Sequence, residues 1–373
     1  MAFRRTVATL VVCLLGVVLA AGQGAPAQNQ QMAEQVYLNV QVLKGIPVDQ
    51  FNDTMGMFSA ALLLDCVGCH DPKITSDTKA FAAATPRIQR ARQMVVMMNT
   101  INKMFFGGEK RVTCFTCHTG DPQPERSPSL RLQYGELVED PSSLKFFPSL
   151  AAPPADAILA KYIQALGGAE RLAKVTSFAA TGTYSGFDTS DQAVPMELFA
   201  MADRRAMVAH GVGADLFWTY DGRNGWRYQP DTPVPLVELT GSNLTGARVD
   251  ALVSFPARIP QAFAQWQVGF ADIDGRQVEV VRGTNAGQLP VNLSFDESGV
   301  LLRLTRWTDT AAGPVPIQTD YSDYREVAGV KMPFHWVMTW TNGQSTIQLN
   351  DVRPNVPIDA ARFARPDLAQ IRR

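Results

Sequence analysis

Two five-residue motifs constrain this chain more than any other feature. They are Cys66-Val67-Gly68-Cys69-His70 and Cys114-Phe115-Thr116-Cys117-His118. The C-x-x-C-H spacing is typical of covalent haem attachment, because two thiols at this separation add to the two vinyl groups of one haem. The adjacent histidine then lies beneath the iron and supplies the proximal ligand.

The cysteine count favours this interpretation. Of the five cysteines, Cys13 lies in the N-terminal apolar run, and the other four all belong to the two motifs. A Cys/His zinc site or a pair of disulfides would use the same residues and is the alternative. We expect two c-type haems. Their predicted covalent attachment points are Cys66, Cys69, Cys114 and Cys117, and their predicted proximal iron ligands are His70 and His118.

The N-terminus predicts export to the periplasm. Arg4 and Arg5 precede an apolar run over residues 6–21, and Ala25-Pro26-Ala27 offers a small-x-small cleavage site. We therefore expect residues 1–27 to be a signal peptide and Gln28 to begin the mature chain. The run is shorter than the roughly 20 residues of a membrane span, and an uncleaved membrane anchor is the alternative. Export agrees with the motifs, because c-type haem is attached after translocation.

Length and charge narrow the function classes. A chain of 373 residues is long enough for two domains. Its net charge of −1 lacks the basic excess of a nucleic-acid-binding protein, so we expect no nucleic-acid partner.

Each motif follows a predicted helix that carries methionines. The first helix opens at 46–49, where Pro47 suits a first turn and Asp49 places an acid near the N-terminal dipole, and we expect it to run into Cys66. The second follows Pro86 and stops at Gly107-Gly108. The two halves therefore form a repeat of helix, short connection and C-x-x-C-H.

The histidine count points to methionine as the sixth iron ligand. Of the four histidines, two are the proximal ligands, while His210 and His335 lie far along the chain. Met/His ligation raises the haem potential, which suits electron transfer. Most helix methionines are core filler. We predict Met55 as the distal ligand of the first haem and Met94 of the second, with Met97 as the alternative. The candidates considered were Met55, Met57, Met94, Met97, Met98 and Met104.

Residues 37–120 resemble the multihaem cytochrome c subunit of photosynthetic reaction centres, and more closely its two-haem, exported relatives in non-phototrophic bacteria. Besides both motifs, the matching segments are Asn39-Val40-Gln41-Val42-Leu43-Lys44, Ile46-Pro47-Val48, Thr54-Met55, Ser59-Ala60-Ala61-Leu62, Ala91-Arg92-Gln93-Met94, Ile101-Asn102, Phe105-Phe106-Gly107-Gly108 and Val112-Thr113. The resemblance implies that the helix methionine is the distal ligand, which maps onto Met55 and Met94. The subunit of phototrophs carries four haems and this chain has two motifs, so photosynthesis is implied by the resemblance alone.

The rest of the chain predicts a proline-rich linker and then a β domain. Residues 121–154 are punctuated by prolines and favour an extended connector. An amphipathic helix over 155–175 is interrupted at Gly167-Gly168, and after Ser177 the apolar period changes to two. We expect hairpins over 215–228, 291–307 and 317–341, strands over 277–282 and 345–350, and partly helical structure over 243–266.

This second region weakly resembles periplasmic lipoprotein-carrier and lipoprotein-sorting proteins. The suggestive segments are Tyr162-Ile163-Gln164-Ala165-Leu166-Gly167-Gly168, Tyr321-Ser322-Asp323-Tyr324-Arg325, Gly329-Val330-Lys331-Met332-Pro333 and Asn355-Val356-Pro357-Ile358-Asp359. The resemblance implies a curved, unclosed antiparallel half-barrel covered by helices, with a concave apolar face for an acyl chain or another hydrophobic ligand. A plain β scaffold without a ligand is the alternative.

The predicted fold class is therefore multidomain. A small all-α dihaem cytochrome domain over 28–120 is followed by the linker over 121–154, a mainly antiparallel β domain over 155–366 and a tail over 367–373. His210 and His335 show no carboxylate or cysteine partner at metal-ligand spacing, so we predict no catalytic residue.

The predicted function is electron transport rather than catalysis. We expect an exported dihaem cytochrome that carries single electrons between periplasmic or membrane-bound redox proteins. The alternative is a protein that binds a lipid or another hydrophobic ligand, with the cytochrome as a redox sensor or tether. A haem enzyme would need an open distal site, which the abundant helix methionines disfavour.

Overall fold

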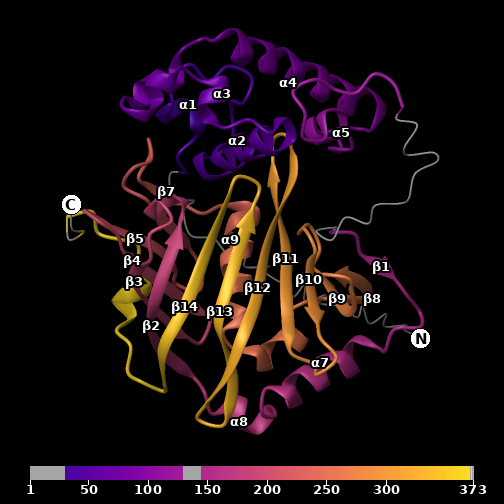
Figure 1. The fold of residues 1–373 in the computed structure, drawn as a ribbon, viewed down its shortest axis with the longest axis vertical. Helices are drawn as coiled ribbons and strands as arrows, with labels where there is room; N and C mark the ends of the chain where they lie inside the picture. Colours follow the sequence, from indigo (N-terminus) through magenta and orange to yellow (C-terminus); the bar gives the residue numbers. More distant parts are fainter. Residues whose placement is uncertain (1–29, 129–143, 370, 372–373) are drawn as a thin grey trace, which may run out of the picture. The chain divides into compact units, whose positions relative to one another are not determined.

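The computed structural model describes residues 30–128, 144–369 and 371 (Figure 1). The chain divides into two units, Met1–Gln30 and Gln31–Arg373, and the description below concerns the second. The predicted signal peptide and its cleavage site lie outside the described residues. Across the described ranges, no helix has both the length and the apolarity needed to cross a bilayer.

The first part of this unit, residues 31–128, is mainly helical and is called the helical segment below. Its α-helices are α1 (Ala33–Val36), α2 (Val48–Leu62), α3 (Cys66–Cys69), α4 (Pro86–Phe105) and α5 (Cys114–His118). Two 3₁₀ turns, Pro72–Thr75 and Thr78–Ala82, lie between α3 and α4. The sequence pattern predicted α2 and α4 but not α1.

Helix α2 ends earlier than its sequence suggests. Leu63 adopts a left-handed conformation with φ of 49°, and the N–H of Leu64 returns to the carbonyl of Ser59. This geometry closes α2 three residues before the first motif, so the prediction that the helix runs into Cys66 is wrong. The side chain of Asp65 then starts α3 by accepting a hydrogen bond from the Gly68 N–H at 2.8 Å.

Helix α4 has the boundaries that its sequence predicts. Thr85 caps it by accepting a hydrogen bond from the Ile88 N–H at 3.2 Å, and Pro86 occupies the first turn. Gly107 and Gly108 both take positive φ, and the Gly108 N–H donates to the Asn102 carbonyl at 3.0 Å. The glycine pair therefore ends the helix as expected.

The second part is a 14-stranded antiparallel sheet. Its strands are β1 (Phe147–Pro148), β2 (Ser177–Gly186), β3 (Val194–Met201), β4 (Arg204–His210), β5 (Asp215–Tyr220), β6 (Gly225–Tyr228), β7 (Leu236–Glu238), β8 (Gln265–Ile273), β9 (Arg276–Thr284), β10 (Val291–Phe295), β11 (Leu301–Thr310), β12 (Gly313–Val327), β13 (Val330–Trp340) and β14 (Gly343–Pro354). The order is β1-β8-β9-β10-β11-β12-β13-β14-β2-β3-β4-β5-β6-β7, which confirms the three predicted hairpins.

Among the described residues, three α-helices accompany the sheet. They are α7 (Ala155–Ala165), α8 (Ala169–Ala173) and α9 (Gly241–Val253), with 3₁₀ turns at Phe187–Thr189, Pro256–Gln261 and Ala360–Phe363. Gly167 and Gly168, at φ of 121° and 92°, separate α7 from α8 as the sequence predicts. The expected partial helix over 243–266 is also confirmed by α9 and the 3₁₀ turn after it.

One face of the sheet, called the inner face below, carries most of the core. The register places Tyr321 opposite Trp336, Trp336 opposite Ile347 and Ile347 opposite Tyr184, so these side chains share that face. Val249 of α9 joins the same core through its cluster with Leu304 of β11. Figure 1 shows α9 behind the central strands.

The predicted linker over 121–154 is described only in part, because residues 129–143 lie outside the described ranges. Its end is not merely a connector. Phe147 pairs with Phe270 as part of the edge strand β1, and the guanidinium of Arg282 lies 4.1 Å from the centre of the Phe146 ring. The linker therefore docks on the edge of the sheet at these phenylalanines.

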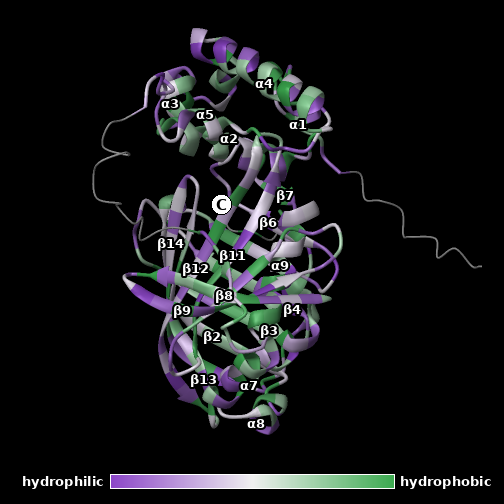
Figure 2. Ribbon diagram, turned by 90° about the vertical axis from the view of Figure 1, so that its right-hand side faces the viewer, coloured by the Kyte–Doolittle hydropathy of each residue, from purple (hydrophilic) through white to green (hydrophobic). Residues whose placement is uncertain are grey.

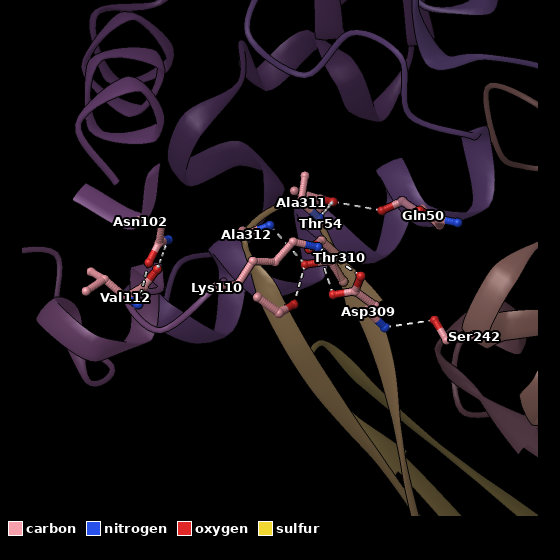
Figure 3. Close-up of polar contacts among 11 residues, drawn as sticks. Gln50, Thr54, Asn102, Lys110, Val112, Ser242, Asp309, Thr310, Ala311 and Ala312 are labelled. Carbon is pink, nitrogen blue, oxygen red and sulfur yellow. Dashed lines mark hydrogen bonds and ion pairs between the residues drawn. The ribbon is translucent and has the colours of Figure 1, made fainter. Parts of the chain in front are cut away.

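Polar bonds join the helical segment to the turn between β11 and β12 (Figure 3). The Lys110 ammonium donates to the Asp309 carboxylate at 2.8 Å and to the Thr310 carbonyl at 2.7 Å. The Ala311 N–H donates to the hydroxyl of Thr54 in α2 at 3.3 Å. Beside these bonds, Met57 of α2 packs against Ala312 and Val315. This turn therefore holds α2 in place through both hydrogen bonds and apolar packing.

Two further contacts bring α2 close to the sheet. A Cβ added at Gly56 would lie 2.9 Å from the side-chain oxygens of Thr341 and Asn342, so the absence of a side chain there permits the approach. Asp49, which the sequence suggested as a helix-dipole residue, is instead 1 % exposed and accepts hydrogen bonds from Thr240. The dipole interpretation thus missed the larger role of Asp49 as a buried contact.

Candidate cofactor site

The first motif forms one helical turn. Helix α3 places Cys66 and Cys69 three residues apart, so their thiols lie on one side of the turn. His70 follows directly, and its Nδ1 lies 3.1 Å from the carbonyl oxygen of Phe81. The Phe81 ring also packs edge-on against the imidazole at 4.9 Å between ring centres. These contacts fix the orientation of His70.

The second motif has the same construction with a different cap. Thr113 and Thr116 bond reciprocally, with the Thr116 N–H donating to Thr113 Oγ1 at 3.2 Å and the Thr113 N–H to Thr116 Oγ1 at 3.0 Å. His118 ends α5, and its Nδ1 lies 2.8 Å from the carbonyl oxygen of Asp121. The repeat inferred from the sequence is therefore present in the backbone.

Both motif histidines engage a backbone carbonyl through Nδ1. The Nε2 atoms of His70 and His118 make no hydrogen bond within the described ranges. An imidazole whose Nδ1–H donates to a carbonyl and whose Nε2 is free has the arrangement typical of a metal-ligating histidine. Burial lowers the pKa of His70, which favours the neutral imidazole that a metal requires.

The four motif cysteines are free thiols in the structure. Burial raises the pKa of Cys114 to about 11 and also raises the pKa of Cys69, so both thiols are protonated near neutral pH. No group of three or more His, Cys, Asp or Glu side chains arranged to hold a metal occurs among the described residues. The structure thus contains two helical turns, each with two free cysteines and a single motif histidine.

A cavity of about 1530 Å³ brings the two motifs together. Its lining includes the four cysteines and both histidines of the motifs, namely Cys66, Cys69, His70, Cys114, Cys117 and His118. It also extends along the inner face of the sheet, where Tyr184, Trp336 and Ile347 line it. One continuous space therefore reaches both motifs and the interior of the sheet.

Few apolar side chains of the helical segment are buried in the described ranges: Ala33, Leu43, Val48, Met57, Ala61, Val95 and Met98. The one hydrophobic cluster that it enters contains Met57, Phe58 and Cys114 and is completed by residues of the sheet. Nine of the fourteen exposed large apolar side chains in the described ranges belong to this segment: Leu38, Leu63, Val67, Val96, Met97, Met104, Phe105, Phe106 and Phe115. Figure 2 shows hydrophobic stretches along α4. Of these exposed side chains, Leu38 and Met97 line the cavity, where an apolar prosthetic group would cover them.

The structure separates the methionines into two groups. Met55 and Met94 are half-buried and line the cavity, as does Met97, which is 46 % exposed. Met57 is 5 % exposed and packs against the β11–β12 turn, so it belongs to the contact with the sheet. The cavity therefore keeps Met55, Met94 and Met97 as candidates, is also lined by the buried Met98, and sets Met57 aside.

Helix α4 also places arginines at the cavity, which the sequence analysis did not single out. Arg87, Arg90 and Arg92 all line it. Arg87 donates to the carbonyl of Gly68 inside the first motif, and Arg92 donates to the carbonyl of Asn39 at 2.7 Å. Guanidinium groups in this position suit the carboxylates of a prosthetic group. The recurrence of arginine over 87–92 was the available signal.

The two remaining histidines do not share this site. His210 has partners that the sequence did not reveal, since Nδ1 lies 3.1 Å from the Asp215 carboxylate and Nε2 lies 3.6 Å from that of Glu197. The sequence predicted only that His210 has no partner at metal-ligand spacing, and strand pairing is what brings Glu197 close to it. His335 pairs with the hydroxyl of Ser322 at 2.8 Å.

Comparison with known proteins assigns a resemblance to each part. Residues 15–131 match the family model of the photosynthetic reaction centre cytochrome C subunit, and residues 193–349 match a family of unknown function, DUF6544. A photosynthetic reaction center cytochrome c subunit of Roseobacter denitrificans is 29% identical over 109 residues, which is 26% of this chain and 28% of that protein. The chain thus spans little more than a quarter of that relative.

Solved structures resemble the sheet-bearing half. An outer membrane lipoprotein-sorting protein domain from Vibrio parahaemolyticus covers 56% of this chain and 94% of its own, with 13% identity and a TM-score of 0.37. A LolA superfamily protein from Nitrosomonas europaea covers 57% of this chain and 98% of its own, with 14% identity and a TM-score of 0.37. The N-terminal region thus resembles the cytochrome subunit in sequence, and the C-terminal half resembles LolA-like proteins in structure.

Proposed function

We propose that this protein is an exported dihaem c-type cytochrome that carries single electrons between periplasmic or membrane-bound redox partners. The observation that carries the proposal is the shared geometry of the two motifs. Each forms a single helical turn at one cavity, with Nδ1 of its histidine on a backbone carbonyl and Nε2 without a hydrogen bond to any described residue. The match to the reaction-centre cytochrome family supports it at family level.

In this proposal the residues hold and orient two haems. Cys66 and Cys69 attach the first and Cys114 and Cys117 the second, while His70 and His118 supply the proximal ligands. Met55 and Met94 are the proposed distal ligands, with Met97 as the alternative for the second haem. When bound, each haem supplies reversible one-electron chemistry of its iron. The protein excludes water through the apolar cavity and fixes both imidazoles.

The proposal extends to the organisation of the chain. Residues 28–120 would form the dihaem domain, 121–154 the linker, 155–366 the β domain and 367–373 the tail. The leader would direct the chain to the periplasm, with an uncleaved anchor as the alternative. The role is that of an electron carrier and not of an enzyme, and the resemblance to a reaction-centre subunit is the reason to include photosynthetic partners among the candidates.

A haem count tests this proposal. The full chain should be expressed with a c-type maturation system and its covalent haem measured by pyridine haemochrome spectrum and intact mass. We expect two haems per chain in the wild type and one in Cys66→Ala/Cys69→Ala or in Cys114→Ala/Cys117→Ala. Fewer than two in a folded wild type would refute the dihaem assignment.

A second function is favoured by the extension of the cavity along the inner face of the sheet. The lining there is largely apolar and includes Phe178, Met207, Trp336 and Met338. We propose that this part holds a lipid or another hydrophobic ligand, with the cytochrome as a redox sensor or tether. Native mass spectrometry of the full chain should then show a co-purifying ligand. If the protein is a plain β scaffold, no ligand should co-purify and the protein should not take up a fluorescent fatty acid.

A further inference from the structure

Three arginines interrupt the apolar inner face of the sheet. Arg205 of β4, Arg227 of β6 and Arg306 of β11 all line the cavity. The register places Arg227 opposite Trp218 and Arg306 opposite Ile317, so these arginines share a face with apolar side chains. A cationic group on such a face is costly unless an acceptor or an anion compensates it.

The donors of these arginines are largely unused. Nη2 of Arg306 lies 3.4 Å from the Asp250 carboxylate, while its buried Nε has no partner within the described residues. The side chains of Arg205 and Arg227 form neither a hydrogen bond nor an ion pair with any described residue. Buried polar groups are nearly always hydrogen-bonded, so the Nε of Arg306 indicates a missing acceptor. Arg205 and Arg227 are half-buried, and their N–H groups are open to a ligand in the cavity.

Electrostatic interactions link these arginines of the cavity in pairs. Arg205 and Arg306 both act electrostatically on the hydroxyl of Tyr321, and Arg227 and Arg306 both act on the carboxylate of Asp53. Arg306 is thus the member shared by both neighbourhoods. The lining of the cavity therefore carries guanidinium groups from three different strands.

The carboxylates that face this region already have other partners. Asp53 accepts from the amide of Asn243 at 2.6 Å, and Asp188 accepts from the hydroxyl of Tyr184 at 2.8 Å. Asp250 faces Arg306. These bonds leave the donors of Arg205 and Arg227 free for a ligand.

We propose that this part of the cavity binds an amphiphile with an anionic head group. The head would bond to Arg205, Arg227 and Nε of Arg306, and the acyl chain would lie along the apolar inner face. The inference rests on the hydrophobic-ligand function proposed above and adds the charge of the head group. A carboxylate and a phosphate share this chemistry, because both present oxyanions that match the guanidinium fork.

Binding by matched amphiphiles tests the charge requirement. Calorimetric titrations of the full-length protein, freed of bound lipid, should compare oleate, 1-oleoyl-lysophosphatidylglycerol and uncharged oleyl alcohol. We expect an anionic ligand to bind at least about tenfold more tightly than oleyl alcohol. Oleate binding alone identifies a free fatty acid, lysophospholipid binding alone identifies a phospholipid, and binding of both supports the shared oxyanion. Equal affinity for oleyl alcohol overturns the head-group inference but upholds the hydrophobic-ligand function, whereas no binding by any of the three overturns both.

A matched pair of variants separates a specific site from bulk charge. Arg205→Gln and Arg227→Gln should each weaken the anionic ligand about tenfold while leaving oleyl alcohol unchanged. Arg204→Gln is the control, because Arg204 precedes Arg205 on β4, points to the opposite face and does not line the cavity. Circular dichroism checks that each variant folds. A loss in Arg204→Gln equal to that in Arg205→Gln would overturn the site.

Discussion

The buried carboxylate of Asp49 accepts a hydrogen bond of 2.6 Å from the backbone N–H of Thr240, which lies 191 residues further along the chain. The Thr240 hydroxyl also donates to it at 2.7 Å. Burial nevertheless raises the pKa of Asp49, because the loss of hydration outweighs the hydrogen bonds that lower it. The helical segment is therefore fixed to the sheet through an acid that is costly to ionise.

The first prediction concerns pH. Since the pKa of Asp49 is higher in the folded than in the unfolded state, the folded protein keeps a proton that the unfolded chain has released. The free energy of unfolding should therefore fall as pH rises from about 4, the unfolded value, through the raised folded pKa. Urea unfolding at several pH values should show a shallower fall in Asp49→Asn than in the wild type.

Asp77→Asn is the control for this experiment, because Asp77 is exposed and its side chain, among the described residues, accepts only from the nearby Lys79 N–H. It should keep the wild-type dependence on pH. If the stability of Asp49→Asn varied with pH as that of the wild type does, the pKa of Asp49 would be the same in the folded and the unfolded state.

The second prediction concerns Gly313, which begins β12. Its φ is +123°, and an added Cβ would lie 2.4 Å from Cγ2 of Thr113, the residue that caps the second motif. Gly313→Ala should lower the free energy of unfolding by about 2–4 kcal/mol, since backbone strain and a clash add. Gly287→Ala isolates the strain, because its φ is +70° with nothing within 4 Å of the added Cβ. Equal losses in chemical denaturation would mean that the clash relaxes without cost.

The third prediction separates methionine ligands from methionine core. Met55→Ala and Met94→Ala should each remove the thioether-to-iron absorption band of one haem. Met57→Ala should keep both bands but lower stability by about 2–5 kcal/mol, because Met57 packs against Ala312 and Val315. Optical and paramagnetic resonance spectra provide the measurement. Loss of a band in Met97→Ala, with both bands kept in Met94→Ala, would assign the second haem to Met97.

The fourth prediction concerns Lys110. Its ammonium bonds to Asp309, but the two side chains are 39% and 54% exposed, so solvent screens the pair. Lys110→Met should lower stability by less than about 1 kcal/mol, and the difference should shrink further in high salt. Arg111→Met serves as the matched control, because Arg111 pairs only with the nearby Glu109. A loss of several kcal/mol for Lys110→Met would indicate that the pair is far less hydrated than its exposure implies.

Periodicity predicted the elements whose residues interact locally. The apolar period of two from Ser177 onward led to the hairpin of β5 and β6 and to that of β12 and β13. Likewise, Pro86 and the pair Gly107-Gly108 marked α4 by their own backbone preferences. Such features depend on short-range geometry, which a sequence displays directly.

Contacts between residues distant in the sequence could not be predicted from periodicity or local backbone preference. The pattern at the end of α2 continues toward Cys66, yet Leu63 takes a left-handed turn that no glycine announces. Asp49 suited a helix dipole, and its true partner Thr240 is unrecognisable without the fold. His210 likewise meets Glu197 only because β3 and β4 pair. In each case tertiary structure decided what local preference left open.

The bare backbone of Gly56 has a practical consequence for protein engineering. Because α2 lies so close to Thr341 and Asn342 there, its surface is complementary to these residues and is not suited to exposure to water. Grafting residues 31–120 into another protein would leave Asp49 and Met57 without the residues that they contact in this chain. A stable excised form of the helical segment must include the tips of two hairpins or have that side of α2 redesigned.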